Sequence, residues 1–259
     1  MIKDIVLLIT EYLDDYDSIN LIEIFDQKLL KYYIGKSFYY SLEEIKKNNL
    51  NRIKITGIDL KEDDDFDELS KYPYINSLSL GYFNKSIKVF PSSLTYLHLG
   101  HSFNQLIIKF PSSLTYLHIG YKFDQIIEQF PSSLTELELG LRFNQPIKMF
   151  PSLLTKLSLG IKFNHPVKEF PSSLTELNIG HSFNQLIKEF PSSLTYLNLG
   201  YSFNQSIKNF PDSLIEIVFE HKYSHAITIK TKKLKKIRIS KLYNLKNLNV
   251  NNDTQIILY

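Results

Sequence analysis

Two histidines and one glutamate follow one another at intervals of 20 residues, and side chains of these types can bind zinc. They are His98, His118 and Glu138. Neutral imidazole nitrogens and carboxylate oxygens are both zinc ligands in proteins. Nothing in the sequence completes a closed ligand set, however, and the same interval recurs for residue types that bind no metal. We therefore expect neither a metal nor any other cofactor.

Motifs of catalytic sites are missing from the sequence. It has no Gly-x-Ser-x-Gly nucleophile turn, no glycine-rich phosphate-binding loop and no His-Glu-x-x-His pair. It also has zero cysteines, which excludes a disulfide framework and thiolate metal sites. We expect no enzymatic activity, and we expect a reducing compartment.

The interval of 20 residues is the period of a sequence repeat. Glycines stand one period apart at Gly100, Gly120, Gly140, Gly160, Gly180 and Gly200. Each copy begins with the spacing Leu-x-x-Leu-x-Leu, as at Leu94, Leu97 and Leu99. Two leucines that alternate with one other residue lie on one face of a short strand. Such a strand cannot bury that face alone, so the copies must stack into a parallel sheet with a continuous core.

The remainder of each copy must return the chain to the next strand. Only about 14 residues are left for this return, and Pro111 and its equivalents lack a backbone donor, so we expect extended or 3₁₀ structure and no outer helix. Phe103, Ile107 and Phe110 should point inward. Gly100 should relieve close contacts where the chain leaves the strand, and Asn104 should form a ladder with its equivalents.

Two segments carry a resemblance to a known family. Phe-Asn-Gln-Pro-Ile at Phe143 to Ile147 and Phe-Pro-Ser-Ser-Leu-Thr at Phe110 to Thr115 resemble the FNIP repeat. That family is related to leucine-rich repeats and is known mostly from social amoebae and the giant viruses that infect them. The resemblance covers about residues 75–225, and it implies a solenoid that binds other proteins.

The first fifty residues show the period of helices instead of strands. Apolar residues at positions i, i+3, i+4, i+7 and i+8 form one helix face, and they are Ile5, Leu8, Ile9, Tyr12 and Leu13. Leu21 and Phe25 indicate a second short helix, and Leu29, Leu30 and Tyr33 indicate a third. Ser41 with Glu44 forms a capping box that predicts a fourth helical segment through Asn49.

The segment from Asp4 to Asp17, followed by Leu21, resembles an F-box, the motif that binds the Skp-type linker protein of cullin ubiquitin ligases, and the resemblance covers about residues 1–35. The resemblance implies that the linker contacts Ile5, Leu8, Ile9, Tyr12, Leu13 and Leu21. The alternative is that this unit only caps the open end of the solenoid, since stacked repeats need capped ends. The two interpretations are compatible.

These observations predict an α+β chain with four regions. Residues 1–48 form a small F-box-like helical domain, and residues 49–74 form an irregular first coil or linker. Residues 75–225 form a leucine-rich-repeat-like parallel β-solenoid with coils of about 20 residues, and residues 226–259 form degenerate C-terminal repeats and a cap.

Solenoids usually bind partners on the strand face that looks away from the core. The residues between the leucines form two variable rows there, and our candidates for substrate binding are Tyr96, His98, Tyr116, His118, Glu136, Glu138, Lys156 and Tyr196. Tyrosine is favoured at interfaces because it combines a large contact area with a polar tip. An unconstrained solvated face would also vary, and the sequence leaves this alternative open. The threonine row at Thr95 and its equivalents is expected to be structural.

Charged segments mark both ends of the repeats. Asp63 to Asp65 with Asp67 and Glu68 indicate a solvated loop that serves as a hinge or linker. Nine lysines or arginines and no acidic residue lie between His221 and Val250. We expect these cations to keep the terminal sheet edge soluble, and we do not expect nucleic acid to bind there.

The net charge is +3, and no apolar run reaches the roughly 18 to 20 residues of a membrane-spanning helix. We expect a soluble protein of the cytoplasm or nucleus, or of the host cytoplasm if it is viral, with no membrane partner. The predicted function is a substrate-recognition adaptor of a Skp–cullin–F-box ubiquitin ligase, whose solenoid binds an unknown target protein. The alternative is a stand-alone protein-interaction scaffold.

Overall fold

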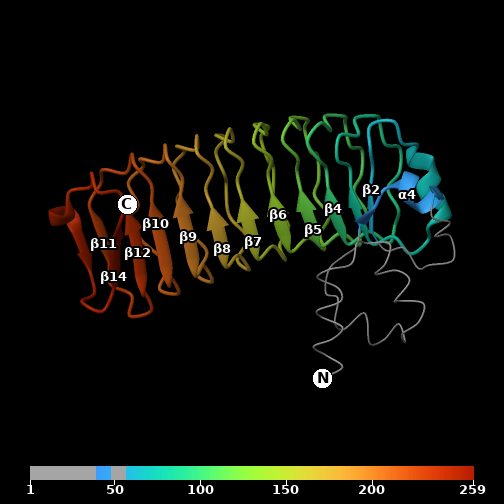
Figure 1. The fold of residues 1–259 in the computed structure, drawn as a ribbon. Coiled ribbons are helices and arrows are strands. Elements are labelled where there is room, and N and C mark those ends of the chain that lie inside the picture. Colours follow the sequence, from blue (N-terminus) through green and yellow to red (C-terminus); the bar gives the residue numbers. More distant parts are fainter. Residues whose placement is uncertain (1–38, 48–56) are drawn as a thin grey trace, which may run out of the picture.

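Short strands, one to a coil, pair side by side along the length of the chain (Figure 1). The computed structural model describes residues 39–47 and 57–259, and within them twelve strands form one parallel sheet. In spatial order they are β1 (Tyr39–Tyr40), β2 (Gly57–Asp59), β3 (Ser77–Ser79), β4 (Tyr96–His98), β5 (Tyr116–His118), β6 (Glu136–Glu138), β7 (Lys156–Ser158), β8 (Glu176–Asn178), β9 (Tyr196–Leu199), β10 (Glu216–Phe219), β12 (Lys236–Ile239) and β14 (Gln255–Leu258). The predicted parallel β-solenoid is confirmed.

The register of the sheet follows the sequence repeat. Leu97 pairs with Leu117, and Leu117 pairs with Leu137, so equivalent residues of neighbouring coils lie side by side. The leucines face the core, where Leu97 and Leu99 are 0% exposed. The residues between them face away from the core and form the outer surface of the sheet.

The return segments fill the core without forming a helix. Between residues 75 and 225 the described chain contains only strands, turns and extended segments. Phe103, Ile107 and Phe110 are buried, as predicted. The first phenylalanine of each copy stacks on the next, with ring centroids 6.2 Å apart between Phe103 and Phe123. These rings fill the interior of the coils.

Polar side chains bridge one coil to the next at two turns. The amide of Asn104 donates to Oδ1 of Asn84, and the amide of Asp124 donates to Oδ1 of Asn104, each at 2.9 Å. The hydroxyl of Thr115 donates to the carbonyl of Thr95 at 3.0 Å. Both ladders continue through later coils, so the asparagine ladder and the structural role of the threonine row are confirmed.

The glycines form a column in which backbone packs directly on backbone. We call it the glycine column, and it comprises Gly81, Gly100, Gly120, Gly140, Gly160, Gly180 and Gly200. A Cβ at Gly140 would lie 1.9 Å from the carbonyl oxygen of Gly120. After Gly200 the equivalent positions hold Glu220 and Ser240, which follow four-residue strands, as Gly200 itself does. Close approach of the coils is therefore what requires glycine here.

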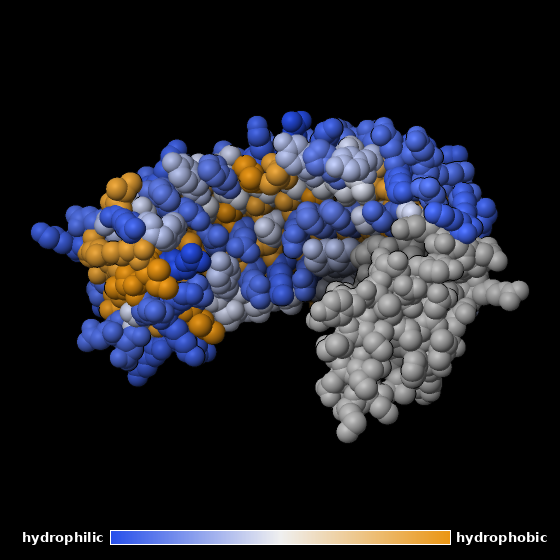
Figure 2. All heavy atoms as spheres, in the orientation of Figure 1, coloured by the Kyte–Doolittle hydropathy of each residue, from blue (hydrophilic) through white to orange (hydrophobic). Residues whose placement is uncertain are grey.

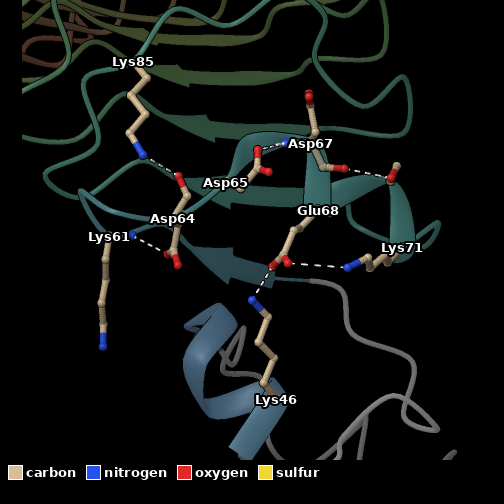
Figure 3. Close-up of polar contacts among 9 residues, drawn as sticks. Lys46, Lys61, Asp64, Asp65, Asp67, Glu68, Lys71 and Lys85 are labelled. Atoms are coloured by element: carbon tan, nitrogen blue, oxygen red, sulfur yellow. Dashed lines mark hydrogen bonds and ion pairs between the residues drawn. The ribbon is translucent and has the colours of Figure 1, made fainter.

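The first coils carry two short helices (Figure 3). The predicted helical segment after Ser41 is α4 (Leu42–Lys47), and its Leu42 and Ile45 are buried in the solenoid core. The second is a 3₁₀ helix, η2 (Phe66–Lys71). The helices predicted between residues 1 and 35 lie outside the described residues.

The acidic run after β2 is part of the folded solenoid and is not the hinge that we expected. Asp65 caps η2 by accepting from the amide of Asp67 at 3.0 Å. Glu68 forms an ion pair with Lys46 at 2.7 Å and so joins η2 to α4 (Figure 3). The main-chain carbonyl of Asp64 accepts from Lys85 of the following coil. The side chain of Asp65 therefore caps a helix, and that of Glu68 joins two helices.

The C-terminal coils differ from the rest by adding a second, two-stranded sheet. It pairs β11 (Ile227–Ile229) with β13 (Leu248–Val250), and a 3₁₀ helix, η3 (Leu245–Asn247), precedes β13. The edge strand of the main sheet is β14, which has no charged residue. Lys236 and Arg238 lie on β12, which β14 covers. Lys236 and Arg238 therefore lie one strand in from the edge strand, so these two residues do not protect the terminal edge as expected.

Candidate protein-binding surface

The surface of the sheet presents two rows of variable residues along the solenoid. The first row runs from Tyr96 through Tyr116 and Glu136, and the second runs from His98 through His118 and Glu138. Most members of the rows are half-buried between their neighbours in adjacent coils. The strands hold these side chains on one face, at separations of about 4.8 Å, because every coil has the same register.

Four of the predicted residues form stacked pairs on β4 and β5. The rings of Tyr96 and Tyr116 are parallel, with centroids 4.3 Å apart and 3° between the planes. His98 and His118 lie 4.4 Å apart. Glu138 on β6 accepts from the Tyr116 hydroxyl at 3.2 Å and lies 3.5 Å from Nδ1 of His118. The structure therefore brings these residues together as one aromatic group beside a carboxylate.

The surroundings of two of these rings, His98 and Tyr116, favour their uncharged forms. Burial lowers the pKa of His98, and the neighbouring His118 lowers it further, while Asp59 and Glu138 partly oppose the shift. Burial also raises the pKa of Tyr116, and the charge of Glu138 adds to this effect. His98 is therefore neutral at pH 7, and the Tyr116 hydroxyl stays protonated and donates a hydrogen bond to Glu138.

Charged residues continue the first row beyond the aromatic group. Lys156 lies between Glu136 and Glu176, with its Nζ 3.8 Å and 3.9 Å from their carboxylates. All three side chains are well exposed, so each ion pair adds little to stability. Tyr196 lies on β9, three strands beyond Glu136, where burial and the charge of Glu216 raise its pKa. Tyr196 is thus separate from the Tyr96 and Tyr116 pair.

Zinc ligation has no geometric support in the described part of the chain. His98 and His118 are used in a ring stack, and the described residues contain no group of three His, Asp or Glu side chains that could hold a metal ion. None of the described helices is long and apolar enough to cross a bilayer.

A third row, which the sequence reasoning missed, follows the glycine column. We call it the ridge, and it comprises Tyr82, His101, Tyr121, Leu141, Ile161, His181, Tyr201 and His221. Tyrosines and histidines lie toward both of its ends, and some of them stack, such as His101 on Tyr121 at 4.8 Å and His181 on Tyr201 at 4.6 Å. Every member is aromatic or apolar although none lies in the leucine pattern, and that signal could have identified the row.

The six predicted linker-binding residues lie outside the described residues. They are Ile5, Leu8, Ile9, Tyr12, Leu13 and Leu21. Their assignment stays a prediction from the F-box resemblance.

Comparison with known proteins agrees with the repeat architecture. The FNIP Repeat family model matches six overlapping segments that together run from residue 83 to residue 222. CroV588, a giant-virus protein described as a novel circular LRR protein, is similar in structure, with a TM-score of 0.69 and 36% sequence identity. The functional domain of InlJ from Listeria monocytogenes, which includes a cysteine ladder, is similar in fold, with a TM-score of 0.55 and 16% identity.

The chain spans only part of these similar proteins. The alignment with CroV588 covers 79% of this chain and 33% of CroV588, and the alignment with InlJ covers 80% of this chain and 51% of the InlJ domain. No curated protein matches the chain significantly. The family model, by contrast, covers more than half of the sequence. With its register of identical coils and buried phenylalanines, the chain belongs to the FNIP repeat family and has the fold of leucine-rich repeats.

Proposed function

We propose that the protein is a substrate-recognition adaptor of a Skp–cullin–F-box ubiquitin ligase. In this proposal residues 1–48 recruit the linker protein, and the repeats at 75–225, between an irregular first coil at 49–74 and a terminal region at 226–259, bind a target protein. The chain acts by bringing the two together, and the chemistry belongs to the recruited ligase. The support for linker recruitment by residues 1–48 is the F-box resemblance, which covers about residues 1–35.

The support for target binding is the exposed surface of the sheet. Each coil has the same core, yet the outward rows change from aromatic to charged along the solenoid. In the target-binding part of the proposal, Tyr96, Tyr116, His98 and His118 form an aromatic centre, and Glu136, Glu138 and Lys156 supply charged contacts at its border. Tyr196 would form a separate contact. Aromatic anchors of this kind contribute much of the binding energy in protein interfaces.

Linker capture by the full-length chain tests the proposal. Removing residues 1–48 would also remove β1 and α4, whose Leu42 and Ile45 are buried in the core, so substitutions give a sharper test. We expect the full-length protein to retain a co-expressed Skp-type linker through affinity purification. Leu8→Asp with Leu13→Asp should abolish retention, because it places charge on the predicted apolar contact face.

A matched control places charge on an exposed apolar residue of an outer loop. Leu186→Asp, at a side chain that is 59% exposed, should retain the linker. If the unsubstituted full-length chain does not retain the linker, the adaptor proposal is wrong. The second candidate, a stand-alone interaction scaffold whose N-terminal unit is a cap, would then be favoured by the burial of α4 against the solenoid.

A further inference from the structure

We propose that the ridge binds a protein segment in which an apolar side chain lies between two carboxylates. This inference rests on the part of the proposed function in which the solenoid binds a protein, and it does not depend on the F-box. It assigns a second contact surface, distinct from the rows on the strands, and it specifies the chemistry of the partner.

The centre of the ridge is an exposed apolar patch. Leu141 is 41% exposed and Ile161 is 44% exposed, although both belong to well-packed coils. Tyr121, beside Leu141, is 37% exposed. Apolar side chains gather above β6 and β7 in Figure 2, over the coils that contain these residues. A patch of this kind, with polar residues around it, is typical of a contact site for an apolar anchor.

A row of cations lies directly beside this patch. Lys122, Arg142 and Lys162 each follow a ridge residue by one position and are exposed. None of the ion pairs in the described ranges 39–47 and 57–259 involves any of the three. Unpaired cations beside an apolar patch select for carboxylates in a partner, and arginine can bind a carboxylate through two parallel hydrogen bonds.

Hydrogen bonds between neighbouring coils hold the row in place. The amide of Lys122 donates to the carbonyl of His101 at 3.1 Å, and the amide of Arg142 donates to the carbonyl of Tyr121 at 3.2 Å. The guanidinium of Arg142 lies over the ring of Tyr121, 5.3 Å from its centroid. The backbone of the site is therefore ordered before a partner binds, which lowers the entropic cost of binding.

The geometry of the rings argues against single-stranded nucleic acid as the partner. Nucleic-acid-binding surfaces use exposed ring faces on which bases stack. Here one face of Tyr121 stacks on His101, with 9° between the planes, and Arg142 lies over the same ring. The strands of the neighbouring coils also carry Glu136, Glu138 and Glu176, which repel phosphates. These features favour a protein partner.

The spacing of the cations limits the shape of the partner. Lys122 and Lys162 are two coils apart, which corresponds to about 10 Å along the solenoid. Residues i and i+7 of a helix are also about 10 Å apart and lie on the same face, with residues i+3 and i+4 between them. A helical segment with carboxylates at i and i+7 and leucines at i+3 and i+4 would match the ridge.

Fluorescence anisotropy with the full-length protein tests this inference. The probe is a labelled alanine-rich peptide with Glu at positions i and i+7 and Leu at i+3 and i+4, and a second peptide has Lys in place of both Glu residues. We expect the unsubstituted protein to bind the Glu peptide and not the Lys peptide. The triple substitution Lys122→Glu, Arg142→Glu and Lys162→Glu should weaken binding of the Glu peptide at least 10-fold and allow the Lys peptide to bind.

A control variant makes the same change in net charge at positions outside the ridge. Lys168, Lys188 and Lys208 are also one period apart, are exposed on the outer loops, and take part in none of the ion pairs of the described residues. Replacing these three by Glu should leave binding of the Glu peptide unchanged. Circular dichroism would establish that both triple variants are folded.

Several results would overturn the inference. These are no binding of the Glu peptide to the unsubstituted protein, equal binding by the ridge variant, and equal loss in the control variant. Binding of poly(U) RNA that the ridge substitutions abolish would assign the ridge to nucleic acid instead. In the adaptor proposal, linker retention depends on residues 1–48 and not on the ridge. A failure of peptide binding therefore leaves that proposal standing, and a failure of linker retention leaves the ridge inference standing.

Discussion

Residues on the sheet surface that are one period apart in the sequence are neighbours in the structure. His98 and His118 are 20 residues apart, and the register places their rings 4.4 Å apart. The sequence was sufficient to predict that Tyr96, His98, Tyr116, His118 and Glu138 would be neighbours, because only the period was needed. It could not show that the tyrosines stack face to face or that Tyr116 donates to Glu138, since these depend on side-chain rotamers.

The histidine pair predicts a loss of stability in acid. The pKa of His98 is lowered in the folded state, so at pH values below its ordinary value of 6.5 the unfolded chain binds a proton that the folded chain does not. Stability contributed by the neutral ring should therefore fall as the pH drops below about 6.5. Urea denaturation between pH 8 and pH 5 would measure this.

Two variants isolate the contribution of the pair from that of other titrating groups. His98→Gln should make the free energy of unfolding less dependent on pH in this range. His118→Gln should do so to a smaller extent, because it removes only the neighbouring charge and leaves His98 buried. A pH dependence that is the same in the unsubstituted protein and in His98→Gln would contradict this assignment.

The repeat pattern was sufficient to predict most of the elements that stabilise each coil. The leucine strands, the inward phenylalanines and the asparagine ladder follow from alternation and from the chemistry of turns. The sequence did not reveal the ridge, because its members lie outside the leucine pattern. They follow the glycine positions, where the repeat pattern does not require an apolar residue. It also placed the acidic run in a linker, since the contacts that join this run to the rest of the solenoid involve Lys46 and Lys85, which are distant in the sequence.

The glycine column predicts a steep cost for adding one methyl group. In Gly140→Ala the new Cβ would meet the Gly120 carbonyl at 1.9 Å, so the backbone of one coil must move away from the next. We expect a loss of about 2 kcal/mol or more in the free energy of unfolding. Leu141→Ala, one residue away on an exposed side chain, should cost less than about 1 kcal/mol. Chemical denaturation would compare them, and equal losses would show that the close contact is not what requires glycine.

At the scale of the whole molecule, each coil packs only on its neighbours, and stability is approximately a sum over coils and the contacts between them. The described residues form one continuous core from Leu42 to Tyr243. The ends are less regular than the middle, and they are also where sequence reasoning failed. A period predicts the interior of a solenoid, whereas an end depends on the particular strand or helix that covers it, as β14 covers β12.

Removal of one complete period should preserve the fold. Deleting residues 124–143 joins Phe123 to Asn144, and every remaining coil keeps an equivalent neighbour. We expect the shape of the circular dichroism spectrum to stay the same and Tm to decrease modestly. Deleting only residues 124–133 brings the turn residues of one coil against the strand of another, and it should abolish cooperative unfolding. Similar behaviour of the two deletions would contradict the view that identical coils are interchangeable.

The glycine column also has a consequence for the gene. Any missense change in one of its seven codons introduces a Cβ, because glycine is the only residue without one, and the Cβ would point at the backbone of the preceding coil. No amino-acid replacement in the column is therefore conservative, whatever its polarity or size. Codons for the sheet rows and the ridge carry no such restriction. Mutations can therefore change the outward-facing rows while the scaffold stays fixed.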